Sequence, residues 1–175
     1  MQSLRSFFSS PRTWRRVWTH GSVASLLSAA LLAWRGRAET GSAAAAINAP
    51  SHWLWGRKAL RSDGTNLRHT LLGMAIHHAS SVFWAVFYEA LQARRRRAAS
   101  GSVLVDAAAV TAAAALVDLR LVPERLTPGF ERRLSAPSLS CVYLGFAVGL
   151  ALGGLLVRQA AASSPARAGA ADRSA

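Results

Sequence analysis

Apolar stretches alternate with arginine-rich joints along this chain. Four stretches, at about 17–34, 70–91, 102–122 and 138–157, are each close to the roughly 20 residues with which a helix crosses the hydrocarbon core of a bilayer. The last stretch is the strongest, because no charged residue occurs between positions 134 and 157. The third is the weakest, because it contains Asp106 and Asp118 and is rich in alanine, which adds little to insertion. The pattern predicts an all-α integral membrane bundle of four transmembrane helices.

Residues 40–56 are also uncharged, but they contain Asn48, Pro50 and His52. A lipid-exposed crossing here would strain the backbone at the proline and bury several polar groups. We therefore expect a short half-helix that begins near Ser51 and lies at the interface or re-enters between helices. A full crossing would instead give five spans and move the arginines at 94–97 to the other side. Around the membrane domain at 17–158, residues 1–16 form a basic cytoplasmic leader and 159–175 a disordered tail.

Three glycines of the last stretch follow one another at four-residue spacing: Gly145, Gly149 and Gly153. They lie on one side of a helix and form a glycine-zipper pattern, against which a second helix can approach closely. We expect this face to pack on the third span or on the same span of a second copy. A homo-oligomer therefore remains one of the expected arrangements.

The charge of the chain supports the membrane interpretation through its placement. The 175 residues carry 21 basic and 8 acidic side chains, for a formal net charge of +13. The arginines flank apolar stretches, as the positive-inside rule and anionic headgroups favour, and do not line a helix face as in a nucleic-acid binder. The expected partner is the lipid bilayer, with another membrane protein possible and no nucleic acid. The basic N-terminus and the arginines at 94–97 place both termini in the cytoplasm.

The second span carries the side chains best suited to proton transfer or metal binding. A polar stripe recurs at spacings of 3, 4, 4, 3 and 4 and follows one helix face: Thr70, Gly73, His77, Ser81, Trp84 and Tyr88. Such a stripe should face other helices or a wet cavity, and imidazole can relay protons or bind metal. The candidate polar path consists of His77, His78, Ser81, Glu89 and Asp118. The structural alternative is that the histidines only hydrogen-bond to neighbouring helices.

The remaining motifs are less specific. Asn48 and His52, beside the tryptophans of NAPSHWLWG, form a candidate loop site or an interfacial anchor. Cys141 is the only cysteine, which excludes an intramolecular disulfide and a Cys-based metal site. Phosphate loops, dinucleotide fingerprints, a serine nucleophile elbow and HExxH are absent. No catalytic residue and no cofactor is predicted, and whether the histidines bind a metal stays open.

A resemblance to known proteins rests on four sequence segments: INAPSHWLWG, LRHTLLGMAIHHASSVFWAVFYEAL, VDLRLVPERLTPGFERRLS and the glycine-rich last span. Over roughly residues 45–157 the chain resembles a group of small uncharacterised polytopic inner-membrane proteins of proteobacteria. The resemblance implies a multi-pass protein of the bacterial inner membrane and transfers no site residues. We expect a structural or accessory role. The alternatives are a small proton- or ion-coupled transporter or channel subunit and, second, a metal-dependent membrane enzyme.

Overall fold

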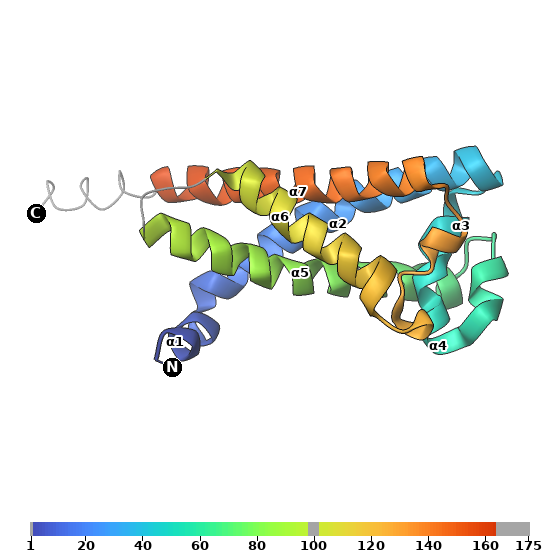
Figure 1. The fold of residues 1–175 in the computed structure, drawn as a ribbon, viewed down its shortest axis with the longest axis horizontal. Helices are drawn as coiled ribbons and strands as arrows, with labels where there is room; N and C mark the ends of the chain where they lie inside the picture. The colour runs from blue at the N-terminus through green and yellow to red at the C-terminus, as the bar shows by residue number, and fades with distance from the viewer. Residues whose placement is uncertain (1, 98–101, 164–175) are drawn as a thin grey trace, which may run out of the picture.

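Four long helices dominate the computed structural model, which describes residues 2–97 and 102–163 (Figure 1). A short helix α1 (Gln2–Ser9) leads into α2 (Pro11–Thr40). The other long helices are α5 (Leu72–Arg97), α6 (Val103–Leu116) and α7 (Ala136–Ala162). Within the described ranges the chain forms only helices, turns and loops, so the predicted all-α class is confirmed.

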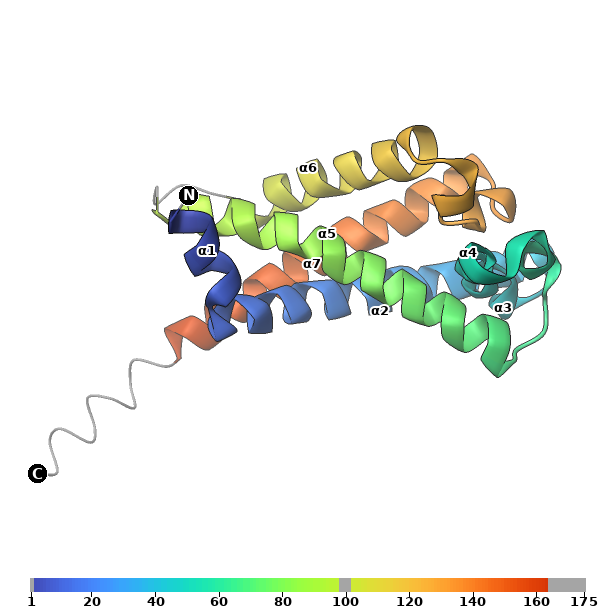
Figure 2. The same cartoon turned by 90° about the horizontal axis from the view of Figure 1, so that it is seen from below.

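The long helices form a ring of neighbours. α2 contacts α5 and α7, and α6 contacts the same two helices from the other side. Successive helices run in opposite directions, so α1, the end of α5, the start of α6 and the end of α7 lie together at one end of the bundle (Figures 1 and 2). The connections that follow α2 and α6 lie at the opposite end, which we call the loop end.

Short helices make up the loop end. Those between α2 and α5 are α3 (Ala43–Asn48), η1 (Ala49–Ser51), α4 (His52–Trp55), η2 (Gly56–Arg61) and the π turn η3 (Leu67–Leu71). Those between α6 and α7 are the π turn η4 (Val117–Leu121), η5 (Glu124–Leu126) and η6 (Phe130–Arg132). Residues 40–56 therefore form several short helices and no single crossing helix, and α4 begins where the half-helix was expected.

Polar residues define where the long helices begin. α2 starts at Pro11, because the Ser10 hydroxyl accepts the backbone N–H of Thr13 at 3.4 Å, which is an ordinary N-cap. At the start of α7 the carboxylate of Glu39 caps the helix. It accepts the backbone N–H of Ser135 at 2.7 Å and also the hydroxyls of Ser135 and Ser138. A negative charge at a helix N-terminus is favourable, so the end of α2 fixes the start of α7.

The glycine face of α7 lies against α2. A Cβ added at Gly149 would stand 2.5 Å from the Ala24 Cα, and one at Gly153 would stand 2.8 Å from the His20 Cα. At Gly145 the nearest atoms belong to the side chain of Leu31. The expectation that this face packs on the third span was therefore wrong: α6 contacts α7 on an adjacent face, near Gly154. Spacing alone predicts a flat face but not which helix covers it.

Three helices are long and apolar enough to cross a membrane, by length and composition: Pro11–Thr40, Leu67–Arg95 and Ala136–Ala162. The third predicted span is not among them. α6 has 14 residues and continues into the π turn η4, and this segment includes Asp106, Asp118 and Arg120. In the flanks, residues 11–16 of the basic leader belong to α2, and residues 159–162 continue α7 into the start of the segment expected to be disordered. Residues 164–175 of the predicted tail lie outside the described residues.

The interior of the bundle is largely apolar, with cores around Leu150 and Leu32, but its surface and its buried charges are unusual for a water-soluble bundle. Large apolar side chains are exposed on all four long helices, among them Leu26 (65% exposed), Phe83, Leu104 and Leu144 (66%). Ionisable and polar side chains are instead fully buried between the helices, among them His20, Glu89, Gln92 and Asp106. In soluble proteins such charged groups are almost never fully buried unless paired.

Candidate functional site

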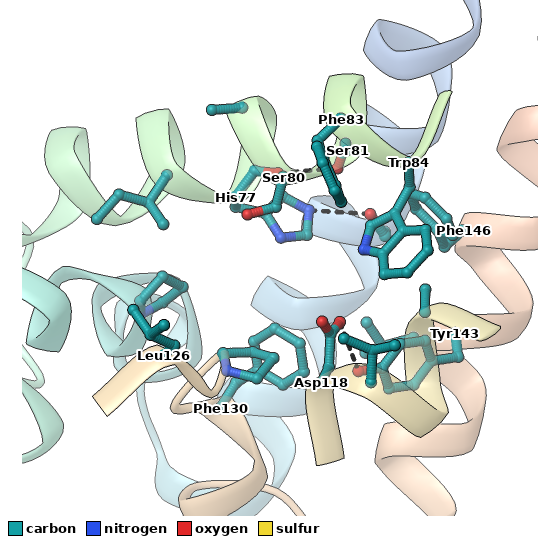
Figure 3. Close-up of a pocket in the computed structure, with 18 of the residues that line it drawn as sticks. His77, Ser80, Ser81, Phe83, Trp84, Asp118, Leu126, Phe130, Tyr143 and Phe146 are labelled. Atoms are coloured by element: carbon teal, nitrogen blue, oxygen red, sulfur yellow. Dashed lines mark hydrogen bonds between the residues drawn. The ribbon is translucent and has the colours of Figure 1, made fainter. Parts of the chain in front are cut away.

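A cavity of about 530 Å³ lies between α5, the end of α6, α7 and the loop that follows η4 (Figure 3). Its walls are mostly apolar and include six aromatic side chains from both the helices and the loop end: Trp53, Phe83, Trp84, Phe130, Tyr143 and Phe146. One histidine and one carboxylate line it, His77 from α5 and Asp118 from η4. Figure 3 shows them on opposite walls, with the Asp118 carboxylate directed into the space between.

His77 is oriented by α2. Its Nε2 lies 2.9 Å from the Ser28 hydroxyl, which itself donates to the Ala24 carbonyl at 2.7 Å. We assign the single hydroxyl proton of Ser28 to its shorter bond with the Ala24 carbonyl, which makes His77 Nε2 the donor toward Ser28. In the neutral ring the other nitrogen is then an acceptor, and Figure 3 shows it on the cavity side. The Ser81 hydroxyl donates to the His77 carbonyl at 2.8 Å within α5.

Asp118 is held by α7. The Tyr143 hydroxyl donates to Asp118 Oδ2 at 3.2 Å. Within the described part of the chain, no Lys or Arg side chain makes an ion pair with Asp118. The sequence analysis named Asp118 but missed Tyr143, because the two are 25 residues apart and no spacing rule connects them.

Other members of the polar stripe contact different elements in turn. Near the loop end, the Thr70 hydroxyl donates to Asn48 Oδ1 at 2.7 Å. At the far end of α5, the Tyr88 hydroxyl donates to the Val103 carbonyl at 3.3 Å. His78 points elsewhere, and its ring centroid lies 5.8 Å from that of Trp18 on α2. The stripe thus faces neighbouring segments along its length, and only its middle part borders the cavity.

Glu89 belongs to a separate buried cluster between α5 and α2. Its carboxylate lies 3.1 Å from His20 Nε2 and 3.5 Å from an Arg16 guanidinium nitrogen. The side chains of Glu89 and His20 are each 1% exposed. The sequence analysis did not single out His20, which lies within the apolar stretch at 17–34. The sequence signal for this cluster was weak, because a spacing of four residues, as between Arg16 and His20, is common in helices.

A second buried cluster joins α5, α6 and α7 at the same end. Asp106 accepts from Gln92 Nε2 at 2.7 Å and pairs with Arg95 at 2.5 Å. Arg158 donates to Gln92 Oε1 at 3.0 Å. Asp106 is 1% exposed, so its charge is compensated inside the protein.

Asn48 and His52 are engaged within the loop end. Asn48 is fully buried, and its amide donates to the carbonyls of Ser62 and Gly64 at 2.8 and 2.9 Å. His52 Nδ1 lies 2.9 Å from the Ala49 carbonyl. Gly129 packs against the same imidazole with φ +83°, a conformation that favours glycine. These contacts tie the two loops together.

Within residues 2–97 and 102–163, no three His, Cys, Asp or Glu side chains are grouped so that they could hold a metal ion. No protein family, no curated protein and no solved structure matches the chain. The resemblance to small proteobacterial inner-membrane proteins therefore stays a prediction, and function is inferred from the residues and their geometry.

Proposed function

We propose that the protein is a multi-pass integral protein of the bacterial inner membrane, with four crossing helices and both termini in the cytoplasm. The observation that carries this proposal is the exposure of large apolar side chains on all four long helices, combined with ionisable side chains buried between them. Leu26, Phe83, Leu104 and Leu144 face outward on four different helices. Each such side chain is worth roughly 1.5–3 kcal/mol when it leaves water, which a hydrocarbon environment supplies. Trp18 and Trp34 are exposed near the two ends of the apolar part of α2, where headgroup-level aromatics are favoured.

The buried cluster at Asp106 supports α6 as the fourth crossing helix. A charged side chain near the centre of a lone helix costs about 2.5–3.5 kcal/mol on insertion. Asp106 stands in the first turn of α6, where Gln92 and Arg95 of α5 already compensate it. We infer that α6 enters the membrane together with its neighbours. The short α3 and α4 then form the re-entrant or interfacial part at the loop end.

The role that fits these contacts best is structural or accessory, with the bilayer as the principal partner. The groups of the candidate polar path stand at separate places: His77 and Asp118 at the cavity, His78 beside Trp18, and Glu89 with His20. A proton or ion path needs such groups in sequence, so this separation favours a structural role. The glycine-zipper face of α7 serves the same role, because it brings α2 and α7 into close contact.

Topology reporters test the crossing number. Alkaline phosphatase and green fluorescent protein are fused after residue 63, after residue 97 and at the C-terminus. Four crossings predict phosphatase activity only after residue 63 and fluorescence after residue 97 and at the C-terminus. Phosphatase activity after residue 97 would contradict the proposal, because the segment at 40–56 would then cross or α5 would not.

Flux measurements separate the structural role from transport. The protein is reconstituted in liposomes and a pH gradient is imposed. We expect no ion or proton flux above that of protein-free liposomes. A flux that the substitution Asp118→Asn abolishes would instead establish a transporter or channel.

A further inference from the structure

We propose that the cavity between α5, η4 and α7 binds a lipophilic organic cation, with Asp118 as its counter-charge. This inference concerns a ligand site and does not depend on the number of membrane crossings. It rests on three independent observations: the charge balance of the lining, the hydrogen-bonding character of His77 and the aromatic walls.

The carboxylate that lines the cavity has no basic side chain beside it in the lining. The lining contains Asp118 and no Lys or Arg. Glu131 lies close enough to Asp118 for the two carboxylates to interact electrostatically. Glu131 pairs with Arg132 only at 3.9 Å, and its Oε2 is buried without a hydrogen-bond partner in the described part of the chain. Two neighbouring carboxylates repel one another, so a cation in the cavity would relieve this repulsion.

His77 and Asp118 supply acceptors to the cavity, beside the indole N–H donor of Trp84 and the hydroxyl of Ser80. Tyr143 already donates to Asp118, and Ser81 donates within its own helix. His77 uses its proton on Ser28, so its second nitrogen offers a lone pair on the cavity side. A ligand that lies between His77 and Asp118 therefore meets partial negative charge on one wall and a full negative charge on the other. A protonated amine or another organic cation complements both walls.

The aromatic walls and the volume of the cavity indicate what kind of body the cation carries. Aromatic faces attract cations through their quadrupole, most strongly for tryptophan, and Trp53 and Trp84 both line the cavity. A volume of about 530 Å³ lies in the range of small-molecule sites. A small inorganic cation would instead need several oxygen ligands, whereas most of this lining is apolar. The geometry therefore selects a cation with a bulky, ring-bearing body.

A pair of ions with the same shape and opposite charge tests the inference. The full-length protein is purified in a non-ionic detergent and titrated with tetraphenylphosphonium or with tetraphenylborate by isothermal calorimetry. We expect saturable binding of one phosphonium per chain and no saturable binding of the borate. Tetraphenylborate binding as tightly as the phosphonium, or no saturable binding of either ion, would overturn the proposal.

Variants locate the site. Asp118→Asn keeps an acceptor for the Tyr143 hydroxyl and removes the charge, so we expect phosphonium affinity to fall about tenfold or more. Glu124→Gln is the matched control, because Glu124 is an exposed acid of the same loop that does not line the cavity. It should leave the affinity unchanged. Equal affinity of Asp118→Asn and the unmodified protein would overturn the proposal.

A second variant keeps the test decisive if Asp118→Asn does not fold. Ala114→Leu adds three carbon atoms to the cavity wall and leaves every charged side chain in place. We expect it to weaken phosphonium binding while the far-UV circular dichroism stays unchanged. Unchanged binding in folded Ala114→Leu would place the ion elsewhere and overturn the assignment. Membrane extraction and topology are unaffected by either outcome, so failure of the cation site is distinguishable from failure of the membrane proposal.

Discussion

The contact between Gly149 of α7 and Ala24 of α2 gives the most quantitative prediction for the bundle. A Cβ at position 149 would stand 2.5 Å from the Ala24 Cα and 3.0 Å from the Ala24 nitrogen. Carbon atoms pack at about 3.5–4.0 Å, so Gly149→Ala forces the two helices about 1 Å apart. The atoms that it meets belong to the backbone and cannot rotate away. The whole α2–α7 contact must therefore adjust.

Gly145 provides a matched comparison four residues earlier on the same face. Its added Cβ meets the terminal methyl of Leu31, a flexible side chain, and the next atom lies at 3.4 Å. Both substitutions gain roughly 1 kcal/mol of intrinsic helix stability, and this gain cancels in the comparison. Overpacking costs about 1–3 kcal/mol. We therefore expect Gly149→Ala to be less stable than Gly145→Ala by about 1–3 kcal/mol.

Thermal unfolding in one detergent measures this difference. For a chain of this length 1 kcal/mol corresponds to about 2–4 °C in Tm, so the Tm of Gly149→Ala should lie about 2–12 °C below that of Gly145→Ala. Gly64→Ala, where the added Cβ meets nothing within 4 Å, controls for substitution as such. Equal Tm values for the variants at 145 and 149 would refute the close packing of α7 on α2.

Three further predictions concern charged side chains. Glu39→Ala removes the cap of α7 at Ser135 and should lower the Tm by a few degrees, whereas an unchanged Tm would show that this cap is not formed. Hydrogen bonds from Arg57 and then Arg132 lower the pKa of Glu124 below 4.5. The stabilising contribution of Glu124 is therefore complete above about pH 4.5 and is lost as the pH falls through the folded-state pKa. The acid-induced fall in Tm should be smaller in Glu124→Gln, and identical pH profiles of the two proteins would contradict this. Glu89→Ala leaves a buried cluster uncompensated and should cost about 3–5 kcal/mol in unfolding free energy, whereas a loss below about 1 kcal/mol would place Glu89 in a solvated environment.

The positions of the helices follow from the sequence better than their contacts do. Uncharged runs predict α2, α5 and α7, because a continuous apolar segment bounded by arginines has few other stable conformations in a membrane. The sequence supports α6 less strongly as a crossing helix, because Asp106 and Asp118 oppose insertion unless partners compensate them. Those partners, Gln92 and Tyr143 among them, are far away in sequence. Compensation of a buried charge is a property of the assembled bundle.

For the candidate site too, the sequence predicts positions on a helix better than it predicts contacts between helices. Helical spacing correctly places His77 on a face that meets other helices, because the 3.6-residue period decides which side chains share a face. It cannot tell which neighbour each residue meets. His77 and Asp118 share a cavity, whereas Glu89 lies with His20 in another part of the bundle. The sequence also did not predict that the aromatic residues line one cavity, because they come from α4, α5, η6 and α7 and meet only in the folded chain.

A membrane location requires the exposed leucines and phenylalanines to face lipid. Extraction of cell membranes with alkaline sodium carbonate tests it most directly, because this treatment releases peripheral proteins and leaves integral proteins in the bilayer. The full-length protein should remain entirely in the membrane pellet and enter solution only with detergent. Recovery in the carbonate supernatant, together with a peripheral control protein, would contradict the account.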